Sequence, residues 1–284
     1  MSLREIFTFR TVCATFVAAN GIVMYSNYRK LRKHRPEYKN APPPDEKHRI
    51  AIFDNIAPTY DMLYTAMHSK LGLTAAKARM LKHAKGHVLE VAAGTLENHR
   101  LYGAISSLTA VDRSLAMCLE MRRKIERDMP PFPVTIICGD AASLPFEDES
   151  FNTVVSTHAL CSVENPEACL AEIARVLKPS ARYFALERGR VYYRPLRALL
   201  ELMKVYPNPA IPWTYGHFEH RDPVALVKGC EALKITDFAV FGYGMNYSIV
   251  ARRSDCDKVS DFANTPIPKD GARVVYQYVP ACAS

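Results

Sequence analysis

Short apolar runs and amphipathic stretches alternate through the middle of the chain. The apolar runs are rich in β-branched residues and lack in–out alternation, which is typical of parallel strands buried on both faces. The stretches between them space apolar residues three and four apart, which predicts helices. We expect strands at residues 88–92, 108–112, 134–138, 153–157 and 183–186, and helices at residues 98–105, 115–128 and 166–177.

The ends of the helices and the last apolar runs refine this pattern. Ser114 and Asn165 stand directly before two helices, where a short polar side chain can accept from a free backbone N–H. Residues 238–241 and 247–251 flank a glycine-containing turn and predict a β-hairpin. Strand–helix alternation closed by a hairpin predicts an α/β fold, with a seven-stranded mixed sheet and helices on both faces.

Residues 1–35 have a different pattern, which predicts a membrane anchor or a targeting segment. No charged residue occurs from Thr11 to Tyr28, and five basic residues follow within seven positions. Such a run nearly covers the roughly 30 Å hydrocarbon core of a bilayer. The basic flank predicts that the following domain lies on the cytoplasmic or matrix side. A cleaved presequence and a helix docked on protein are the alternatives.

Composition divides the remaining chain into three parts. Residues 36–49 contain three consecutive prolines and predict a stiff, extended linker. Residues 50–253 carry the alternating pattern of the main domain. Residues 254–284 form a C-terminal tail, in which residues 274–279 predict either an added edge strand or a peptide that lies on a partner protein.

Charge and cysteine content limit which partners, metal sites and compartments are expected. The formal net charge is +8, yet the first 40 residues hold eight lysines and arginines against two acids. The domain therefore lacks the concentrated basic face that nucleic-acid binding needs. The 8 cysteines include no C-x-x-C pair, so we expect no zinc site and a reducing compartment.

Small and acidic residues stand at the ends of the first three predicted strands. Gly94 lies in the loop after the first strand, and Asp112 and Asp140 end the second and third. The carboxyl ends of parallel strands meet at one edge of the sheet, where doubly wound folds bind ligands and an acid can accept both ribose hydroxyls. This order predicts a cofactor that contains a nucleoside.

The same segments resemble those of the class I S-adenosylmethionine-dependent methyltransferases. The resemblance covers residues 50–252 and is to the type 11 group, which contains quinone-biosynthesis C-methyltransferases and membrane-anchored thiol methyltransferase-like proteins. It implies a Rossmann-like seven-stranded methyltransferase sheet. The segments that carry it are FDNIAPTYD at 53–61, LEVAAGT at 89–95, GDAASLPFEDESFN at 139–152, HALCSVEN at 158–165 and EIARVLKP at 172–179.

The resemblance implies S-adenosyl-L-methionine as the cofactor and assigns residues to it. Asp112 would accept from the ribose hydroxyls, with a helix-capping acid as the alternative. Asp140 would accept from the adenine amino group, or serve only to form a turn, and Ala141 would donate its backbone N–H. Ala92 and Gly94 would form the loop around the methionine and ribose portions.

Other polar side chains are candidates with open alternatives. Tyr60 would cover the cofactor or pack in the core, and Glu90 would orient the loop, meet the methionine ammonium or be a structural acid. His158 ends the fourth strand and is the candidate catalytic base, with a packed or exposed histidine as the alternative. His217 and His220 lie in an insertion where this fold often builds the acceptor pocket; we expect no metal there, because no third ligand is evident.

The insertion, residues 194–213, predicts a helix with an apolar face made of Leu196, Leu199, Leu200 and Met203. Such a face is usually core or lid. It could also admit a lipophilic acceptor or dip into a membrane.

Two positions depart from the family pattern. Leu96 stands at the third glycine position of the loop, and Ser180 with Ala181 replaces a glycine pair. A branched side chain at position 96 is expected to occupy cofactor space or to push the loop outward. Both departures favour a domain that has kept its fold and lost its chemistry.

Two functional hypotheses follow. The first is a membrane-anchored S-adenosylmethionine-dependent methyltransferase that acts on a small or lipophilic acceptor. The second is a catalytically inactive subunit or assembly factor of a mitochondrial membrane or ribosomal complex, in contact with its partners through the C-terminal tail. We expect the mitochondrial inner membrane with the domain on the matrix side, or the endoplasmic reticulum membrane with the domain on the cytoplasmic side.

Overall fold

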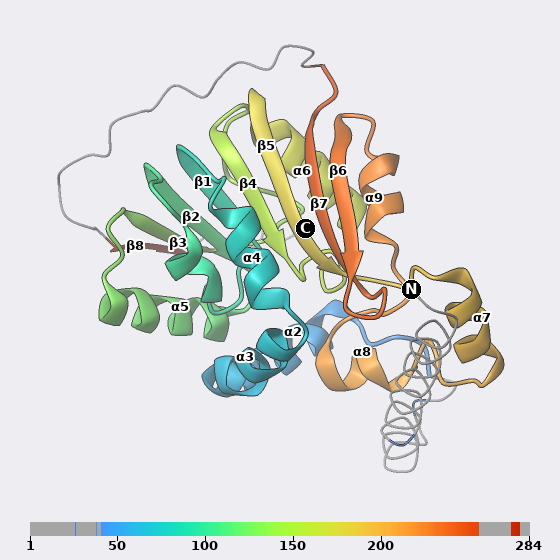
Figure 1. The fold of residues 1–284 in the computed structure, drawn as a ribbon. Coiled ribbons are helices and arrows are strands. Elements are labelled where there is room, and N and C mark those ends of the chain that lie inside the picture. The colour runs from blue at the N-terminus through green and yellow to red at the C-terminus, as the bar shows by residue number, and fades with distance from the viewer. Residues whose placement is uncertain (1–25, 27–37, 39–40, 256–273, 279–284) are drawn as a thin grey trace, which may run out of the picture.

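A mixed β-sheet forms the centre of the protein (Figure 1). The computed structural model describes Ser26, Tyr38 and residues 41–255 and 274–278. The strand order is β6-β7-β5-β4-β1-β2-β3-β8, and only β7 runs antiparallel to its neighbours. The strands are β1 His87–Val91, β2 Ser107–Asp112, β3 Val134–Cys138, β4 Phe151–Thr157, β5 Leu177–Arg188, β6 Leu233–Phe241, β7 Asn246–Arg253 and β8 Val274–Tyr278.

The first seven strands confirm the predicted mixed sheet, with β6 and β7 as the hairpin. The eighth strand comes from the tail: β8 pairs in parallel with β3, which is the edge-strand alternative. The strand order reverses between β1 and its neighbour β4: β2 and β3 follow β1 on one side, and β5 follows β4 on the other. The carboxyl ends of β1 and β4 therefore frame the crevice in which sheets of this topology bind ligands.

Helices cover both faces of the sheet and its carboxyl edge (Figure 1). Helices α4 and α5 pack on one face, and α6 and α9 pack on the other. Helices α2, α3 and α8 lie at the carboxyl edge. The helices are α2 Glu46–Ile56, η2 Ala57–Thr59, α3 Tyr60–Lys70, α4 Leu73–Leu81, η3 Glu97–Leu101, α5 Leu115–Asp128, α6 Pro166–Val176, α7 Arg194–Leu202, α8 Ala210–Tyr215 and α9 Pro223–Gly229, of which η2 and η3 are 3₁₀ helices.

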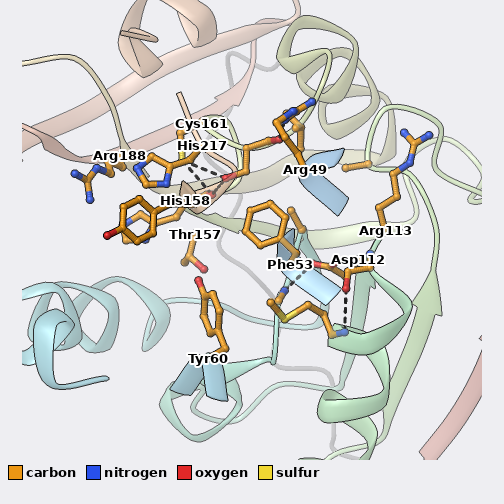
Figure 2. A pocket seen from close by; sticks show the side chains of 18 of the residues that line it. Arg49, Phe53, Tyr60, Asp112, Arg113, Thr157, His158, Cys161, Arg188 and His217 are labelled. Atoms are coloured by element: carbon orange, nitrogen blue, oxygen red, sulfur yellow. Dashed lines mark hydrogen bonds between the residues drawn. The ribbon is translucent and has the colours of Figure 1, made fainter. Parts of the chain in front are cut away.

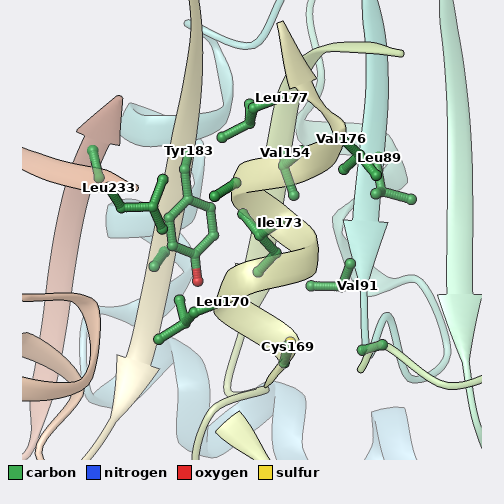
Figure 3. Packing of buried hydrophobic residues seen from close by; sticks show 14 of the residues in the cluster. Leu89, Val91, Val154, Cys169, Leu170, Ile173, Val176, Leu177, Tyr183 and Leu233 are labelled. Carbon is green, nitrogen blue, oxygen red and sulfur yellow. The ribbon is translucent and has the colours of Figure 1, made fainter. Parts of the chain in front are cut away.

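Two apolar cores hold these layers together. On one face, Leu170 and Ile173 of α6 pack with Val154 of β4 and Tyr183 of β5 (Figure 3). The core on the other face contains residues of α4, α5, β1 and β2. Apolar surface buried on both faces explains why these strands are apolar throughout.

The helix predicted at residues 98–105 is wrong. The chain forms only the 3₁₀ helix η3 there, and Tyr102 is already extended. The side chains of Asn98 and Tyr102 both donate to the buried carboxylate of Glu90, and these hydrogen bonds hold the segment in its short form between the left-handed Leu96 and the extended Tyr102. The predicted caps are confirmed: Ser114 Oγ accepts from the Met117 N–H at 3.1 Å, and the Asn165 side chain accepts from the Ala168 N–H at 2.9 Å.

The predicted anchor, residues 1–35, lies outside the described residues except for Ser26. Within the described part of the chain, no helix is both long enough and apolar enough to cross a bilayer. Helix α2 begins at Glu46, inside the segment predicted as linker, and Asp45 caps it by accepting from the His48 N–H at 2.8 Å.

Candidate functional site

The loop after β1 forms part of a pocket at the carboxyl edge of the sheet. Its backbone takes left-handed φ values at Ala92 (49°), Gly94 (57°) and Leu96 (57°). A Cβ atom added to Gly94 would meet no atom within 4 Å, so the loop faces open space at this point. The Gly94 N–H donates to Asp112 Oδ2 at 2.8 Å, which ties the loop to the end of β2.

Leu96 keeps the left-handed turn without a glycine. This conformation costs a residue other than glycine about 1–3 kcal/mol. The Leu96 side chain is 0% exposed in the core beneath α4 and α5, and burying a leucine stabilises a fold by about 1.5–3 kcal/mol. The side chain does not line the pocket. The prediction that Leu96 would occupy cofactor space or push the loop outward is therefore wrong.

The second departure is also accommodated. Ser180 and Ala181 belong to an irregular start of β5, where the register with β4 jumps from Phe151↔Leu177 to Thr153↔Arg182. The extra residues bulge out of the ladder at the amino end of β5, the end opposite to the pocket. The missing glycine pair therefore does not alter the site.

Glu90 lies behind the loop and does not line the pocket. Its side chain is fully buried, and its Oε1 accepts from Asn98 Nδ2 while its Oε2 accepts from the Tyr102 hydroxyl, both at 2.6 Å. Burial raises the pKa of Glu90 to about 7. Both oxygens accept from the segment that follows the loop.

Asp112 stands at the end of β2, beside the loop. Its Oδ2 accepts from the Gly94 N–H, and its Oδ1 accepts from the Ser114 N–H at 2.9 Å. Burial raises the pKa of Asp112 to about 6, although these two hydrogen bonds oppose the shift. Each oxygen still has a lone pair to offer, because a carboxylate can accept about four hydrogen bonds.

The ends of β2 and β3 are joined by an arginine that sequence reasoning missed. Arg113 Nη1 donates to Asp140 Oδ2 at 2.6 Å and to Glu46 Oε1 of α2 at 2.7 Å. The other oxygen of Asp140 accepts from the Ala142 N–H at 2.9 Å. Asp140 and Ala141 thus line the pocket beyond Asp112, and Arg113 fastens α2 across this end.

Helices α2 and α3 close the pocket from the side opposite the sheet. Arg49 is 2% exposed and donates to the Ser162 carbonyl and the Glu164 carboxylate. Asp54 accepts from Ser114 Oγ at 2.5 Å, at the start of α5. The predicted lead-in segment is therefore a lid held by hydrogen bonds and ion pairs, and it brings Phe53 and Tyr60 to the pocket.

The pocket has two chemically different ends. Figure 2 shows Asp112 and Arg113 at one end and His158, Arg188 and His217 at the other, with Phe53 between them. The second end is also lined by Tyr64, Tyr215 and the buried Cys161. Burial raises the pKa of the Cys161 thiol to about 11, so this sulfur stays protonated at neutral pH.

The two histidines at the second end each present a ring nitrogen without a partner. Nε2 of His158 and Nε2 of His217 are buried and form no hydrogen bond with any described residue. Burial, reinforced by Lys77, lowers the pKa of His158 well below its usual value. Burial, reinforced by Arg188, lowers the pKa of His217 to about 3. Both imidazoles are therefore neutral at pH 7. In the tautomer that carries its proton on Nδ1, the unpartnered Nε2, called the bare Nε2 below, can accept a proton.

The pocket holds about 1210 Å³ of empty space, counted out to its open mouth. Its lining brings together seven predicted site residues, and only Glu90 is absent. Sequence reasoning did not single out several other lining groups, because tertiary packing brings them to the pocket. The seven are Tyr60, Ala92, Gly94, Asp112, Asp140, Ala141 and His158; the unforeseen groups include Arg49, Phe53, Tyr64, His68, Arg113, Arg188 and Tyr215.

The described part of the chain holds no cluster of three or more histidine, cysteine or acidic side chains arranged for a metal ion. His217 lies at the pocket, whereas His220 does not line it. The described cysteines are free thiols: Cys118, Cys138, Cys161, Cys169 and Cys230.

The first end of the pocket fits S-adenosylmethionine. The open space above Gly94 leaves room for a ligand against the backbone. Asp112 and Asp140 offer carboxylate oxygens to hydroxyl and amino donors, which ribose and adenine carry. Ala141, which directly follows Asp140, also lines the pocket, and its small side chain leaves room there for the adenine ring.

Comparison with known proteins gives the family. A family profile described as "Methyltransferase domain" matches residues 89–185. The demethylmenaquinone methyltransferase of Renibacterium salmoninarum is 34% identical over 174 residues, which cover 59% of this chain and 69% of the relative. The ubiquinone/menaquinone biosynthesis C-methyltransferase of Paraburkholderia xenovorans is 28% identical over 184 residues, which cover 61% and 72%.

A eukaryotic relative and the solved structures complete the comparison. A mitochondrial methyltransferase of Saccharomyces cerevisiae is 28% identical over 167 residues, which cover 53% of this chain and 36% of the relative. The DhpI–SAH complex aligns with a TM-score of 0.53 at 16% identity and covers 74% of this chain and 97% of its own. The cyclase SpnF aligns with a TM-score of 0.51 at 16% identity, over 64% and 79%.

These two structures show the fold alone, which hosts more than one reaction. The sequence relatives carry the assignment further, because the match at 34% identity spans more than two thirds of the relative. The chain therefore belongs to the S-adenosylmethionine-dependent methyltransferases of class I, in the family that contains the demethylmenaquinone methyltransferases, and its cofactor is S-adenosylmethionine.

Proposed function

We propose that the protein methylates a ring carbon of a lipophilic hydroxyaromatic acceptor, such as a reduced quinone. The bare Nε2 atoms of His158 and His217 carry this proposal, since they stand in an aromatic end of the pocket beside the cofactor end. A phenolic acceptor needs a base to remove its hydroxyl proton. The names of the relatives, demethylmenaquinone and ubiquinone/menaquinone methyltransferases, add support.

The residues at the second end have separate roles in the proposed reaction. Bound S-adenosylmethionine supplies a methyl group that its sulfonium already activates. His158 Nε2 takes the hydroxyl proton of the acceptor, and Arg188 stabilises the phenolate. Asp112 and Asp140 would hold the cofactor, whose methyl carbon would be transferred to the ring carbon with loss of its bond to sulfur. Nε2 of His217 then takes the ring proton and releases it to solvent after the product leaves, and the His158 imidazolium returns its proton to the oxygen, so that one proton is released overall.

The lid contributes position and a dry environment. Phe53 and Tyr60 lie between the two ends and would hold the acceptor ring against the methyl group. Arg113 and Arg49 keep α2 closed over the crevice, which excludes water from the reacting atoms. Orienting two reactants in this way supplies a large part of the rate of such transfers.

The buried position of Leu96 weakens the alternative of an inactive fold. That alternative depended on a leucine that closes the cofactor loop, and the side chain points into the core instead. The bulge at Ser180 and Ala181 likewise lies away from the pocket. We therefore favour an active enzyme.

Replacing Leu96 by glycine is expected to lower the free energy of unfolding by about 1–4 kcal/mol, because the lost core packing outweighs the relieved strain. The affinity for S-adenosylhomocysteine should not rise. Denaturant unfolding and calorimetric titration measure the two quantities, with Leu96→Ala as the matched variant that keeps a Cβ. A glycine variant that bound the cofactor product more tightly would revive the closed-loop hypothesis.

An acceptor assay tests the proposed reaction. Full-length protein is given methyl-labelled S-adenosylmethionine and a demethylated naphthoquinone, either oxidised or reduced with borohydride. We expect label on the ring carbon only with the reduced form, because only the reduced form has a hydroxyl proton for His158 to remove. A small aryl thiol serves as the competing acceptor. A higher kcat/KM for that thiol than for the quinol would refute C-methylation.

We also propose that the protein resides at the mitochondrial inner membrane, with the catalytic domain on the matrix side. The apolar run and basic flank of residues 1–35 and the name of the yeast relative support this location. Protease protection of the domain in mitochondria stripped of their outer membrane is the expected result. Recovery in endoplasmic reticulum vesicles, with the domain open to protease, would support the alternative membrane.

A further inference from the structure

Helix α7 presents apolar side chains on two sides. Its inner side packs Leu196 and Leu200 into a small core with Val191 and Tyr206. Its outer side is apolar as well and faces solvent: Leu202 is 79% exposed and Leu199 is 51% exposed. The outer positions follow helical spacing and comprise Pro195, Ala198, Leu199, Leu202 and Met203. The predicted single apolar face is therefore divided between core and surface.

Aromatic residues extend this outer side. Tyr192 and Tyr193, just before the helix, are 47% and 50% exposed. We call the surface made by Tyr192, Tyr193, Leu199, Leu202 and Met203 the α7 outer face. Tyrosine combines an apolar ring with a polar tip, and this combination suits the boundary between headgroups and acyl chains.

Positive charge borders the α7 outer face. The segment from Arg190 to Lys204 holds four basic residues and a single acid, Glu201. Arg194 and Lys204 are exposed and form no salt bridge with the described residues, whereas Arg197 lies 3.8 Å from Glu201. An amphipathic helix with basic residues beside leucines is typical of a segment that lies in the surface of an anionic bilayer.

The base of α7 is linked to the second end of the pocket. The Tyr206 hydroxyl donates to the Glu219 carbonyl at 2.7 Å, and the Glu219 carboxylate meets Arg188 at 3.3 Å. Arg188 of β5 and Asn246 of β7 line the pocket and are partners in the strand pairing. Tyr192, just before α7, lies against Tyr247 of β7. The α7 outer face and the acceptor end are thus connected through β5, β7 and Tyr206.

We propose that α7 is an interfacial helix, which docks the domain on an anionic phospholipid surface through the α7 outer face and brings the acceptor end of the pocket to the bilayer. Membrane docking rests on the apolar face and its basic border. The further claim, that the acceptor is taken from the bilayer, rests on the proposed function. Phospholipid vesicles without acceptor or cofactor therefore test the docking by itself.

The sequence offers a clean probe, because Trp213 is the sole tryptophan. Trp213 stacks on Tyr38 at 5.0 Å, so Trp213→Phe retains a ring at that position. In this background, Leu202→Trp places the only tryptophan on the α7 outer face. On addition of phosphatidylglycerol-containing vesicles to the full-length protein, we expect its emission to shift to shorter wavelength. Lipids brominated near the headgroup should quench it, since such helices sit about 5–10 Å into the interface.

Matched variants separate docking on lipid from other causes. Leu119→Trp in the same background places the probe at a half-exposed apolar position on α5, at the far side of the sheet, and its emission should not change. Adding Arg194→Gln and Lys204→Gln to the Leu202→Trp protein should raise the fraction of anionic lipid needed for the same shift.

Three outcomes would overturn the proposal. The first is that the protein binds the vesicles while the emission of the Leu202→Trp probe is neither shifted nor quenched, because the α7 outer face would then remain in water. The second is a shift that depends on protein concentration without lipid, which would show contact with a second copy. The third is a shift produced only by other mitochondrial proteins, which would identify a protein partner. Methylation of a water-soluble quinol by a protein that fails the emission test would leave the proposed reaction intact.

Discussion

Replacing His158 by glutamine lowers kcat by about 10²–10⁴-fold, the range that a positioned general base contributes. Glutamine keeps the polarity and approximate length of the side chain, but it cannot take the proton of the acceptor. The affinity for S-adenosylhomocysteine should stay within about threefold, since His158 stands at the end of the pocket remote from Asp112. Single-turnover transfer of labelled methyl at saturating cofactor measures the chemical step.

The pH profile adds a second check. Burial lowers the pKa of His158 well below its usual value, so the base is already unprotonated at neutral pH. The rate at saturating cofactor should therefore show no inflection near 6.5, where an ordinary histidine titrates, and should fall only at more acidic pH. His217→Gln is the matched variant with the second bare Nε2. If His158→Gln kept full activity while His217→Gln lost it, the base would be His217.

Replacing Asp112 by asparagine is expected to weaken binding of S-adenosylhomocysteine by about 10²-fold. Hydrogen bonds to a charged group are each worth about 1.5–3 kcal/mol, and the carboxylate would accept from the two ribose hydroxyls. The asparagine amide also cannot accept from both the Gly94 and Ser114 N–H groups as Asp112 does. Calorimetric titration gives the affinity. Asp148→Asn, at a side chain that is 74% exposed and outside the pocket, is the control.

Asp112 also predicts how binding varies with pH. Burial raises its pKa to about 6 in the free protein, and ribose hydroxyl donors favour the ionised form. Affinity should therefore be constant above pH 7 and decline by up to about tenfold per unit as the pH falls below 6. The asparagine variant should lack this decline. Equal pH dependence in the variant and the parent would show that Asp112 is not the ribose acceptor.

The strands and the first end of the pocket could be predicted because local sequence determines them. An apolar run with an acid at its end marks a buried strand and its carboxyl terminus, so Asp112 and Asp140 were found at the correct edge. Helix α5 was predicted with its exact bounds, since Ser114 caps it and an amphipathic pattern fills it. The segment of η3 was predicted as a longer α-helix, because the hydrogen bonds of Asn98 and Tyr102 to Glu90 depend on tertiary structure and leave no local signal.

The second end of the pocket could be predicted only in part. His158 was found because it follows a strand, whereas Arg188 and Tyr64 carry no local signal. They reach the pocket because the hairpin pairs with β5 and because the lid folds over the edge. Leu96 shows a related limit: sequence gave the position of a missing glycine, but only packing decided where the leucine side chain would go.

That leucine changes the thermodynamics of cofactor binding. A loop built on glycine samples many backbone conformations, and a ligand must select one of them at a cost in conformational entropy. Here the buried Leu96 side chain fixes the turn from within the core, and Gly94 stays open toward the ligand. We therefore expect the loop to be ordered before S-adenosylmethionine arrives, and the conformational entropy lost on binding to be correspondingly small.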